Sequence, residues 1–125
     1  MARITNIERI WVDMPLKEVP WRDMVREIPQ WALFGICRVT LDSGHGGVGE
    51  TMPYYAWGTV SDAAVERAQG ANPVEIMWDD SLGAGLQMAC FDAVGKLNAT
   101  PVWALLGKKF PDQFHMGGWA IYMPV

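Results

Sequence analysis

The sequence predicts an α+β domain, a three-stranded antiparallel meander followed by a bundle of three to four helices. Residues 35–42 alternate between apolar and polar side chains, which is typical of a half-buried antiparallel strand. Further along, apolar residues between Leu86 and Leu97 recur at steps of three and four, so they share one face of a helix. A turn-forming segment, residues 42–45, directly follows the alternating strand, which indicates a hairpin.

The other two strands are predicted on either side of this one. Residues 4–14 read as the first strand and end before a proline, with three apolar residues on one face: Ile10, Val12 and Met14. Residues 47–51 read as the third strand, with Val48 facing inward. A meander is the simplest assembly of three such strands.

Helices fill the second half of the chain. Ser61 is placed to cap a helix that runs to Gln69, and a short helix follows at residues 74–78. Ser81 is predicted to cap the long helix that ends at Leu97. Asn98 can then take the left-handed conformation that ends this helix, and a second short helix spans residues 101–107.

Two long segments rich in aromatic residues leave the same end of the predicted meander. They are residues 15–33, of which 21–28 carry no helix breaker, and residues 50–58. Loops of this length inside a compact domain are usually functional or disordered, and their tryptophans and tyrosines argue against disorder. We interpret them as a wall that covers a partner.

Composition excludes several classes of function. The chain has 125 residues, enough for about one domain but too few for a (β/α)8 barrel. Its net charge is −4 and its basic residues form no run longer than two, so neither nucleic acid nor an anionic membrane is an expected partner. No apolar run reaches the length of a membrane span. Cys37 and Cys90 lie in apolar patterns, which favours buried free thiols and a cytoplasmic protein.

Three motifs resemble chemical sites but favour structural interpretations. Residues 44–49 fit G-x-G-x-x-G, yet no helix is predicted to begin there, so a glycine-rich hairpin is favoured over a dinucleotide site. An acidic group, Glu75 with Asp79 and Asp80, is interpreted as a solvated helical face rather than a cation site. The two histidines, His45 and His115, have no accompanying zinc pattern.

Glu50 ends the third predicted strand where the second aromatic segment begins. It can contact a substrate, or it can anchor the loop by hydrogen bonds. Anchoring is favoured, because a carboxylate would repel an acidic substrate.

The end of the chain has a strand-like apolar segment at residues 114–123 with no evident mate. An unpaired strand would expose an aggregation-prone edge. We therefore expect that the chain is a piece of a longer protein and that the remainder begins with this strand.

Taken in order, these segments resemble the N-terminal capping domain of the mandelate racemase / muconate lactonizing branch of the enolase superfamily. The resemblance rests on the first strand, on VTLDSG (39–44) with GVGE (47–50), and on D-x-x-G-K (92–96) followed by P-V-x-x-L-L-G (101–107). It implies a capping domain over residues 1–112 and, over residues 113–125, the first strand of a C-terminal (β/α)8 barrel that is otherwise missing.

The resemblance also implies a division of labour. The barrel of such enzymes holds Mg²⁺ on three carboxylates and removes a proton next to a substrate carboxylate, in dehydratases, racemases or epimerases, and cycloisomerases, so neither catalytic nor metal-binding residues are expected in this chain. The cap supplies two loops that select a small carboxylate-bearing substrate, and a homo-oligomer is expected. The residues that map onto these specificity loops are Val19, Pro20, Trp21, Met24, Trp31, Glu50, Met52, Tyr54, Tyr55 and Trp57.

Two other functions remain open from the residues alone. The first is a stand-alone α+β binding module without enzymatic activity. The second is a nucleotide-binding half-domain, which would have to bind NAD or ATP. Among the enzymatic alternatives, dehydration of an acid sugar is slightly favoured, because tryptophan and tyrosine also stack on sugars.

Overall fold

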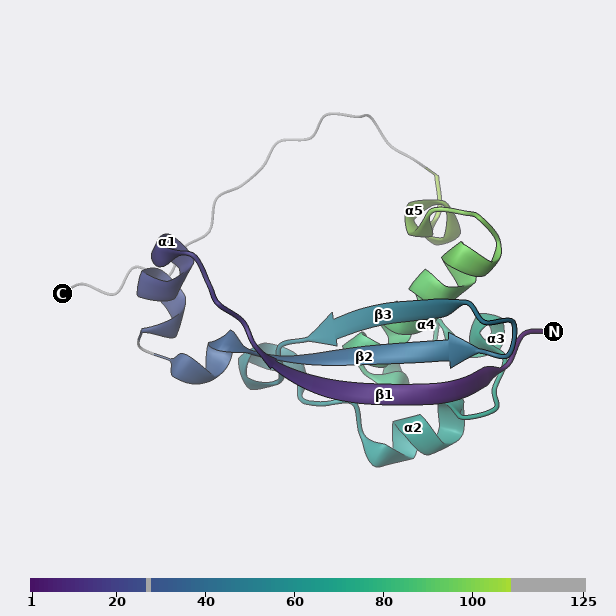
Figure 1. Cartoon of the computed structure of the whole chain (residues 1–125), viewed down its shortest axis with the longest axis horizontal. Helices are drawn as coiled ribbons and strands as arrows, with labels where there is room; N and C mark the ends of the chain where they lie inside the picture. The colour runs from purple at the N-terminus through teal and green to yellow at the C-terminus, as the bar shows by residue number, and fades with distance from the viewer. Residues whose placement is uncertain (27, 109–125) are drawn as a thin grey trace.

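The computed structural model describes residues 1–26 and 28–108, without the side chains of residues 56 and 57. A three-stranded sheet is made by β1 (Ile4–Asp13), β2 (Leu33–Leu41) and β3 (Gly46–Thr51) (Figure 1). Its order is β1-β2-β3 and both pairs are antiparallel, so the predicted meander is confirmed. The predicted strand at residues 114–123, with His115, and the domain boundary at residue 112 lie outside the described residues.

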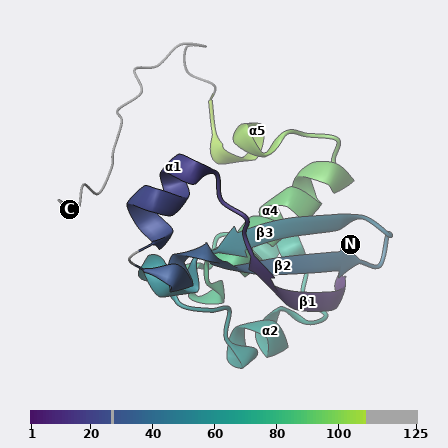
Figure 2. The same ribbon diagram turned by 60° about the vertical axis from the view of Figure 1, so that its left-hand side comes forward.

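Helices follow the sheet in the predicted order. They are α2 (Asp62–Ala68), α3 (Pro73–Ile76), the short 3-10 helix η4 (Asp80–Leu82), α4 (Ala84–Leu97) and α5 (Val102–Leu106). In both views α4 runs behind the sheet, so the domain has two layers (Figures 1 and 2). The predicted α+β class is therefore confirmed. Within the described residues, no helix is both long enough and apolar enough to cross a membrane.

The main core lies between the sheet and α4. The alternation in β2 buries Cys37, Val39 and Leu41, as the sequence predicts, and these side chains are at most 2% exposed. The helical face opposite them is equally buried, and its apolar members are Leu86, Ala89, Cys90, Ala93 and Val94. Two sequence periods, two in the strand and 3.6 in the helix, thus form one interface.

The inner face of β3 carries glycines, so the expectation that Val48 faces inward is wrong. Val48 is 47% exposed, while Gly47 and Gly49 lie buried against α4. A Cβ atom at Gly47 would lie 2.9 Å from the Cα of Ala93, and one at Gly49 would lie 2.7 Å from the backbone nitrogen of Ala89. The helix backbone therefore packs directly on the strand backbone, and no side chain fits between them.

The D-x-x-G-K motif has a structural function in this interface. Asp92 accepts a hydrogen bond of 2.8 Å from the backbone N–H of Val48, on the edge strand, and pairs with Lys96 at 2.7 Å. Gly95 leaves room for the returning chain, since a Cβ there would lie 2.8 Å from the carbonyl oxygen of Thr100. The motif thus attaches α4 to β3 and allows the chain to turn back.

Helix starts agree with the sequence in part. Ser61 caps α2 by accepting a hydrogen bond from the N–H of Ala64, as predicted. Ser81 does not cap α4, which begins at Ala84 after Gly83. Gly83 has a φ of +79°, a left-handed conformation that separates η4 from α4 and leaves Ser81 inside η4.

The left-handed residue at the end of α4 is Ala99, with a φ of +48°, and not Asn98. The Asn98 side chain instead donates a hydrogen bond of 2.9 Å to the carbonyl oxygen of Val94. Asn98 therefore keeps a negative φ of −98°, and the strained conformation falls on a residue with a Cβ atom.

Adding a methyl group at the strand–helix contact tests whether backbone packing holds the two layers together. The added Cβ atom would meet backbone atoms of α4, which cannot move without disturbing the helix. Gly47→Ala and Gly49→Ala are therefore each expected to lower the free energy of unfolding by about 3 kcal/mol or more. Gly85→Ala is the matched control, since its Cβ would meet nothing closer than 3.4 Å. It is expected to be neutral or stabilising by up to about 1 kcal/mol. Chemical denaturation of the full-length protein measures all three, and equal effects would contradict the proposed packing.

Relief of the left-handed strain is expected to stabilise the protein. Ala99→Gly should raise the free energy of unfolding by roughly 1 kcal/mol, because glycine tolerates a positive φ. The control is Ala104→Gly, at an exposed position inside α5, where glycine should cost about 0.5–1 kcal/mol. Thermal denaturation distinguishes the two signs.

Candidate functional site

Both aromatic loops leave the same end of the sheet, as predicted. The first loop, residues 14–32, joins β1 to β2, and the second loop, residues 52–58, follows β3. The register pairs Asp13 with Leu33 and Gly35 with Thr51, so the bases of the two loops are neighbours. They meet beyond the tips of the strands on the side opposite the N-terminus (Figure 1).

The first loop is folded into short helical segments with a small core of its own. These are α1 (Glu18–Pro20), the π-helical η1 (Trp21–Val25) and the 3-10 helix η2 (Pro29–Ala32). A cluster that we call the loop core contains the buried residues Val25, Trp31 and Ala32, with Leu16, Met24, Ile28 and Met52 packed against them. The second loop forms another π-helical segment, η3 (Pro53–Trp57).

The predicted specificity residues divide into an exposed and a buried group. Four aromatic or apolar side chains are between 45% and 58% exposed: Val19, Trp21, Tyr54 and Tyr55. Three others support the loops from inside, since Trp31 is only 9% exposed and Met24 and Met52 are half-buried against it. Pro20 is half-buried, and the side chain of Trp57 lies outside what the structure describes.

Glu50 lies on the outer face of β3, opposite Ile36. Its side chain is exposed, and it makes no hydrogen bond or ion pair with residues 1–26 or 28–108. Thr51 closes the second loop instead, because its hydroxyl donates a hydrogen bond of 3.2 Å to the carbonyl oxygen of Gly58. Sequence reasoning missed Thr51, although the alternation along β3 places it on the inner face with the two glycines.

A hollow of about 310 Å³ opens beside the base of the second loop. Arg9 lies on its wall, where it donates a hydrogen bond of 2.8 Å to the carbonyl oxygen of Val60 and pairs with Asp62. Gly35 offers no side chain to fill the space. The hollow is lined by Arg9, Ile10, Trp11, Gly35, Ile36, Cys37, Thr51, Thr59 and Val60. Arg9 and Trp11 were not singled out in the sequence, although period-two alternation puts them on the face shared with Cys37.

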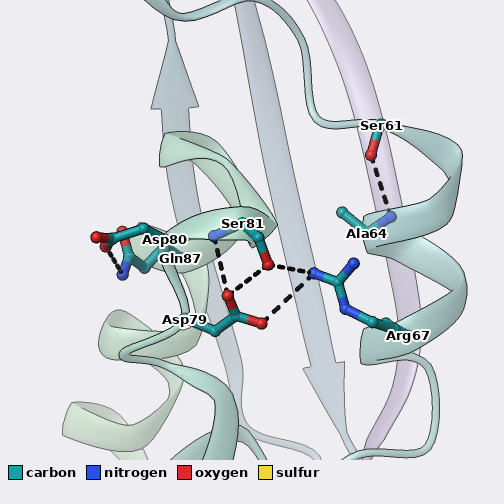
Figure 3. A network of polar contacts seen from close by, with 7 residues as sticks. All are labelled: Ser61, Ala64, Arg67, Asp79, Asp80, Ser81 and Gln87. Atoms are coloured by element: carbon teal, nitrogen blue, oxygen red, sulfur yellow. Dashed lines mark hydrogen bonds and ion pairs between the residues drawn. The ribbon is translucent and has the colours of Figure 1, made fainter.

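The acidic residues Asp79 and Asp80 belong to a network that holds the helices together (Figure 3). Asp79 accepts hydrogen bonds from the backbone N–H and hydroxyl of Ser81 and contacts Arg67 at 3.5 Å. The hydrogen bond from the Ser81 hydroxyl holds the pKa of Asp79 below its usual value. Asp80 accepts a hydrogen bond from Gln87. Within residues 1–26 and 28–108, no three His, Cys, Asp or Glu residues are grouped to hold a metal ion.

Residues 44–49 form a turn and the start of β3, as the hairpin interpretation predicts. Gly44 takes a φ of +82° in the turn, and the hydroxyl of Ser43 lies 3.1 Å from Nδ1 of His45. The segment leads into a strand, so it lacks the helix N-terminus that a dinucleotide-binding loop uses.

Both cysteines are buried and free, in agreement with the sequence. Burial raises the pKa of Cys37 to about 11 and that of Cys90 to about 12, because a thiolate is poorly solvated in the core. Since the thiolate is the reactive form, both thiols are chemically inert in the folded protein.

Thiol labelling tests this burial. Iodoacetamide at about pH 8 is expected to modify neither cysteine in the native protein and both in denaturant.

The same burial predicts how stability depends on pH. An unfolded thiol has a pKa of about 8.5, so the contribution of the buried neutral thiols to the free energy of unfolding is complete below that pH and is lost as the pH rises through the pKa values of the folded protein. Between these limits, the free energy of unfolding should therefore fall more for the wild type than for a Cys37→Ala/Cys90→Ala variant.

Comparison with known proteins finds similar folds in one class of enzymes. No protein-family model and no curated protein matches the sequence. Among solved structures, the chain is similar to an isomerase from Streptomyces coelicolor A3(2), with 28% identity and a TM-score of 0.57 over 86% of this chain and 31% of that one. It is also similar to a mandelate racemase/muconate lactonizing enzyme from Sulfitobacter sp., with 24% identity and a TM-score of 0.61 over 90% of this chain and 31% of that one. The same kind of enzyme from Jannaschia sp. CCS1 matches with 26% identity and a TM-score of 0.56 over 88% of this chain and 32% of that one.

The fold therefore matches part of enzymes of the mandelate racemase / muconate lactonizing type. These similarities support a relationship to the enolase superfamily. The chain spans about a third of the length of the structures it matches.

Proposed function

We propose that this chain is the N-terminal cap that selects the substrate of an enolase-superfamily enzyme. One observation carries the proposal: two loops from different connections meet at one end of the sheet and expose aromatic side chains there. The similarity to isomerases and racemase/lactonizing enzymes over about a third of their length supports it.

In this proposal the loops act by enclosing the substrate. Trp21 and Tyr54 offer flat apolar surfaces that contact a substrate of matching shape, and tyrosine adds a hydroxyl group. Enclosure displaces water, which strengthens electrostatic interactions inside the closed site. The substrate is a small carboxylate, and its dehydration, epimerisation or cycloisomerisation takes place in the remainder of the protein.

The acid/base groups and the Mg²⁺ site belong to that remainder, a C-terminal barrel. In the described part of this chain, the neighbouring carboxylates Asp79 and Asp80 accept hydrogen bonds from Ser81 and Gln87, and the proposal assigns neither of them to the ion. The complete protein is proposed to be a cytoplasmic homo-oligomer.

Substitution of exposed loop residues in the full-length enzyme is the direct test. Trp21→Ala and Tyr54→Ala are each expected to change kcat/KM by about tenfold or more for the preferred carboxylate, and by different factors for other substrates. The measurement is proton exchange or dehydration across a panel of acid sugars and aromatic 2-hydroxy acids.

Trp78→Ala is the matched control, because Trp78 is also 57% exposed but packs on Phe91 in the helical layer. It should leave the order of substrate preference unchanged. Loop variants with wild-type kcat/KM for every substrate would refute the proposal.

A further inference from the structure

We propose that Trp31 is a positioning residue that couples the two loops, so that the first loop sets the position of Tyr55 and of the exposed Tyr54 beside it. The coupling itself depends on the contact between the two loops. Only its consequence for substrate selection rests on the proposed function.

The contact between the loops is an edge-to-face aromatic pair. The ring centroids of Trp31 and Tyr55 lie 5.0 Å apart and the ring planes are inclined by 77°. This arrangement places the positive edge of one ring against the negative face of the other, which gives the contact a preferred geometry. It joins residues that lie on separate connections of the sheet.

Trp31 is the fixed member of the pair. It is 9% exposed, and it belongs to the loop core together with Val25 and Ala32. Its backbone N–H donates a hydrogen bond of 3.0 Å to the carbonyl oxygen of Ile28, and the N–H of Met14 donates one of 2.8 Å to the carbonyl oxygen of Ala32. The ring is therefore held by both packing and backbone.

Tyr55 is the dependent member. It is 45% exposed, and the N–H of Tyr55 donates a hydrogen bond of 3.1 Å to the carbonyl oxygen of Met52. Met52 itself packs against the loop core. Two residues of the second loop, Met52 and Tyr55, thus contact residues of the first loop.

Two tryptophans of the first loop, Trp21 and Trp31, therefore have different roles, although the sequence alone does not distinguish them. Trp31 lies on the same loop as the exposed Trp21 but is buried, so it would act on a ligand through residues of the second loop, which are Met52, Tyr55 and Tyr54. A change at Trp31 is expected to displace the second loop, whereas a change at Trp21 is expected to alter only a surface.

The experiment is a double-mutant cycle in the full-length protein, read by hydrogen exchange at the amide of Tyr55. Trp31→Leu keeps an apolar side chain in the loop core but removes the ring, and Trp31→Phe keeps an aromatic edge. An aromatic pair of this kind corresponds to about a two- to tenfold effect on a local opening equilibrium. Trp31→Leu should accelerate exchange by that factor, and Trp31→Phe should stay near the wild type.

The cycle is completed with Tyr55→Leu. If the pair carries the coupling, Trp31→Leu has no further effect on exchange in the Tyr55→Leu background. Trp78→Ala, which removes an edge-to-face contact with Phe91 elsewhere, should leave exchange at Tyr55 unchanged. An unchanged rate in Trp31→Leu, or the same acceleration in both backgrounds, would overturn the proposal.

A second variant covers the case in which Trp31→Leu fails to fold. Trp31→Met also keeps an apolar side chain in the loop core and has no ring, so it should accelerate exchange at the amide of Tyr55, and an unchanged rate there would overturn the coupling.

Kinetics separate this proposal from the proposed function. In the complete enzyme, Trp31→Leu and Tyr55→Leu should raise KM more than they lower kcat, and their effects should not add. Coupled exchange with unchanged kcat/KM would leave the coupling standing and refute the substrate-selecting role of the loops. If the effects of the two substitutions on hydrogen exchange were additive while kcat/KM changed, the coupling would be refuted and the substrate-selecting role of the loops would stand.

Discussion

The direct contact between the backbones of β3 and α4 is the constraint on which the rest of the domain depends. Gly47 and Gly49 remove every side chain from the inner face of the strand where the helix crosses it. Asp92 then adds a hydrogen bond from the helix to the N–H of Val48. The interface has little freedom to shift, because overpacking here would strike backbone and not a flexible side chain. The position of the sheet relative to the helical layer follows from this contact, whereas the end at which both loops emerge follows from the antiparallel order of the strands.

The domain has two separate apolar clusters, and this separation suits a rigid scaffold that carries adaptable loops. The main core joins the sheet to α2 and α4, whereas the loop core consists of residues from the two loops alone. Small clusters with exposed backbone open at lower free energy than a main core does. A loop can therefore open locally while the strands that hold its ends stay in place. The Trp31–Tyr55 pair makes the two loops rearrange together.

The sequence predicted the elements well where periodicity carried the information, in β2 and in the buried face of α4. It failed where a backbone conformation or a missing side chain decided the outcome. An apolar Val48 between glycines predicts an inward valine, yet close approach requires glycine to face the helix. The cap at Ser81 and the turn at Asn98 failed for a related reason, since φ values at Gly83 and Ala99 set the helix ends. The two loops were located correctly, but the sequence alone did not show that Trp31 is buried while other aromatic residues of the loops are exposed.

The segments that carried the family resemblance prove to be parts of the scaffold. In D-x-x-G-K, the aspartate binds the edge strand and the glycine admits the returning chain, and the hairpin glycines admit the helix. Such residues are dictated by backbone proximity, so they report on the fold and carry no information about the substrate. Under the proposed function, specificity resides instead in the exposed side chains of the two loops. A similar fold occurs in an isomerase and in lactonizing enzymes, and in the proposed cap the choice of substrate depends on Trp21, Tyr54 and the residues that position them.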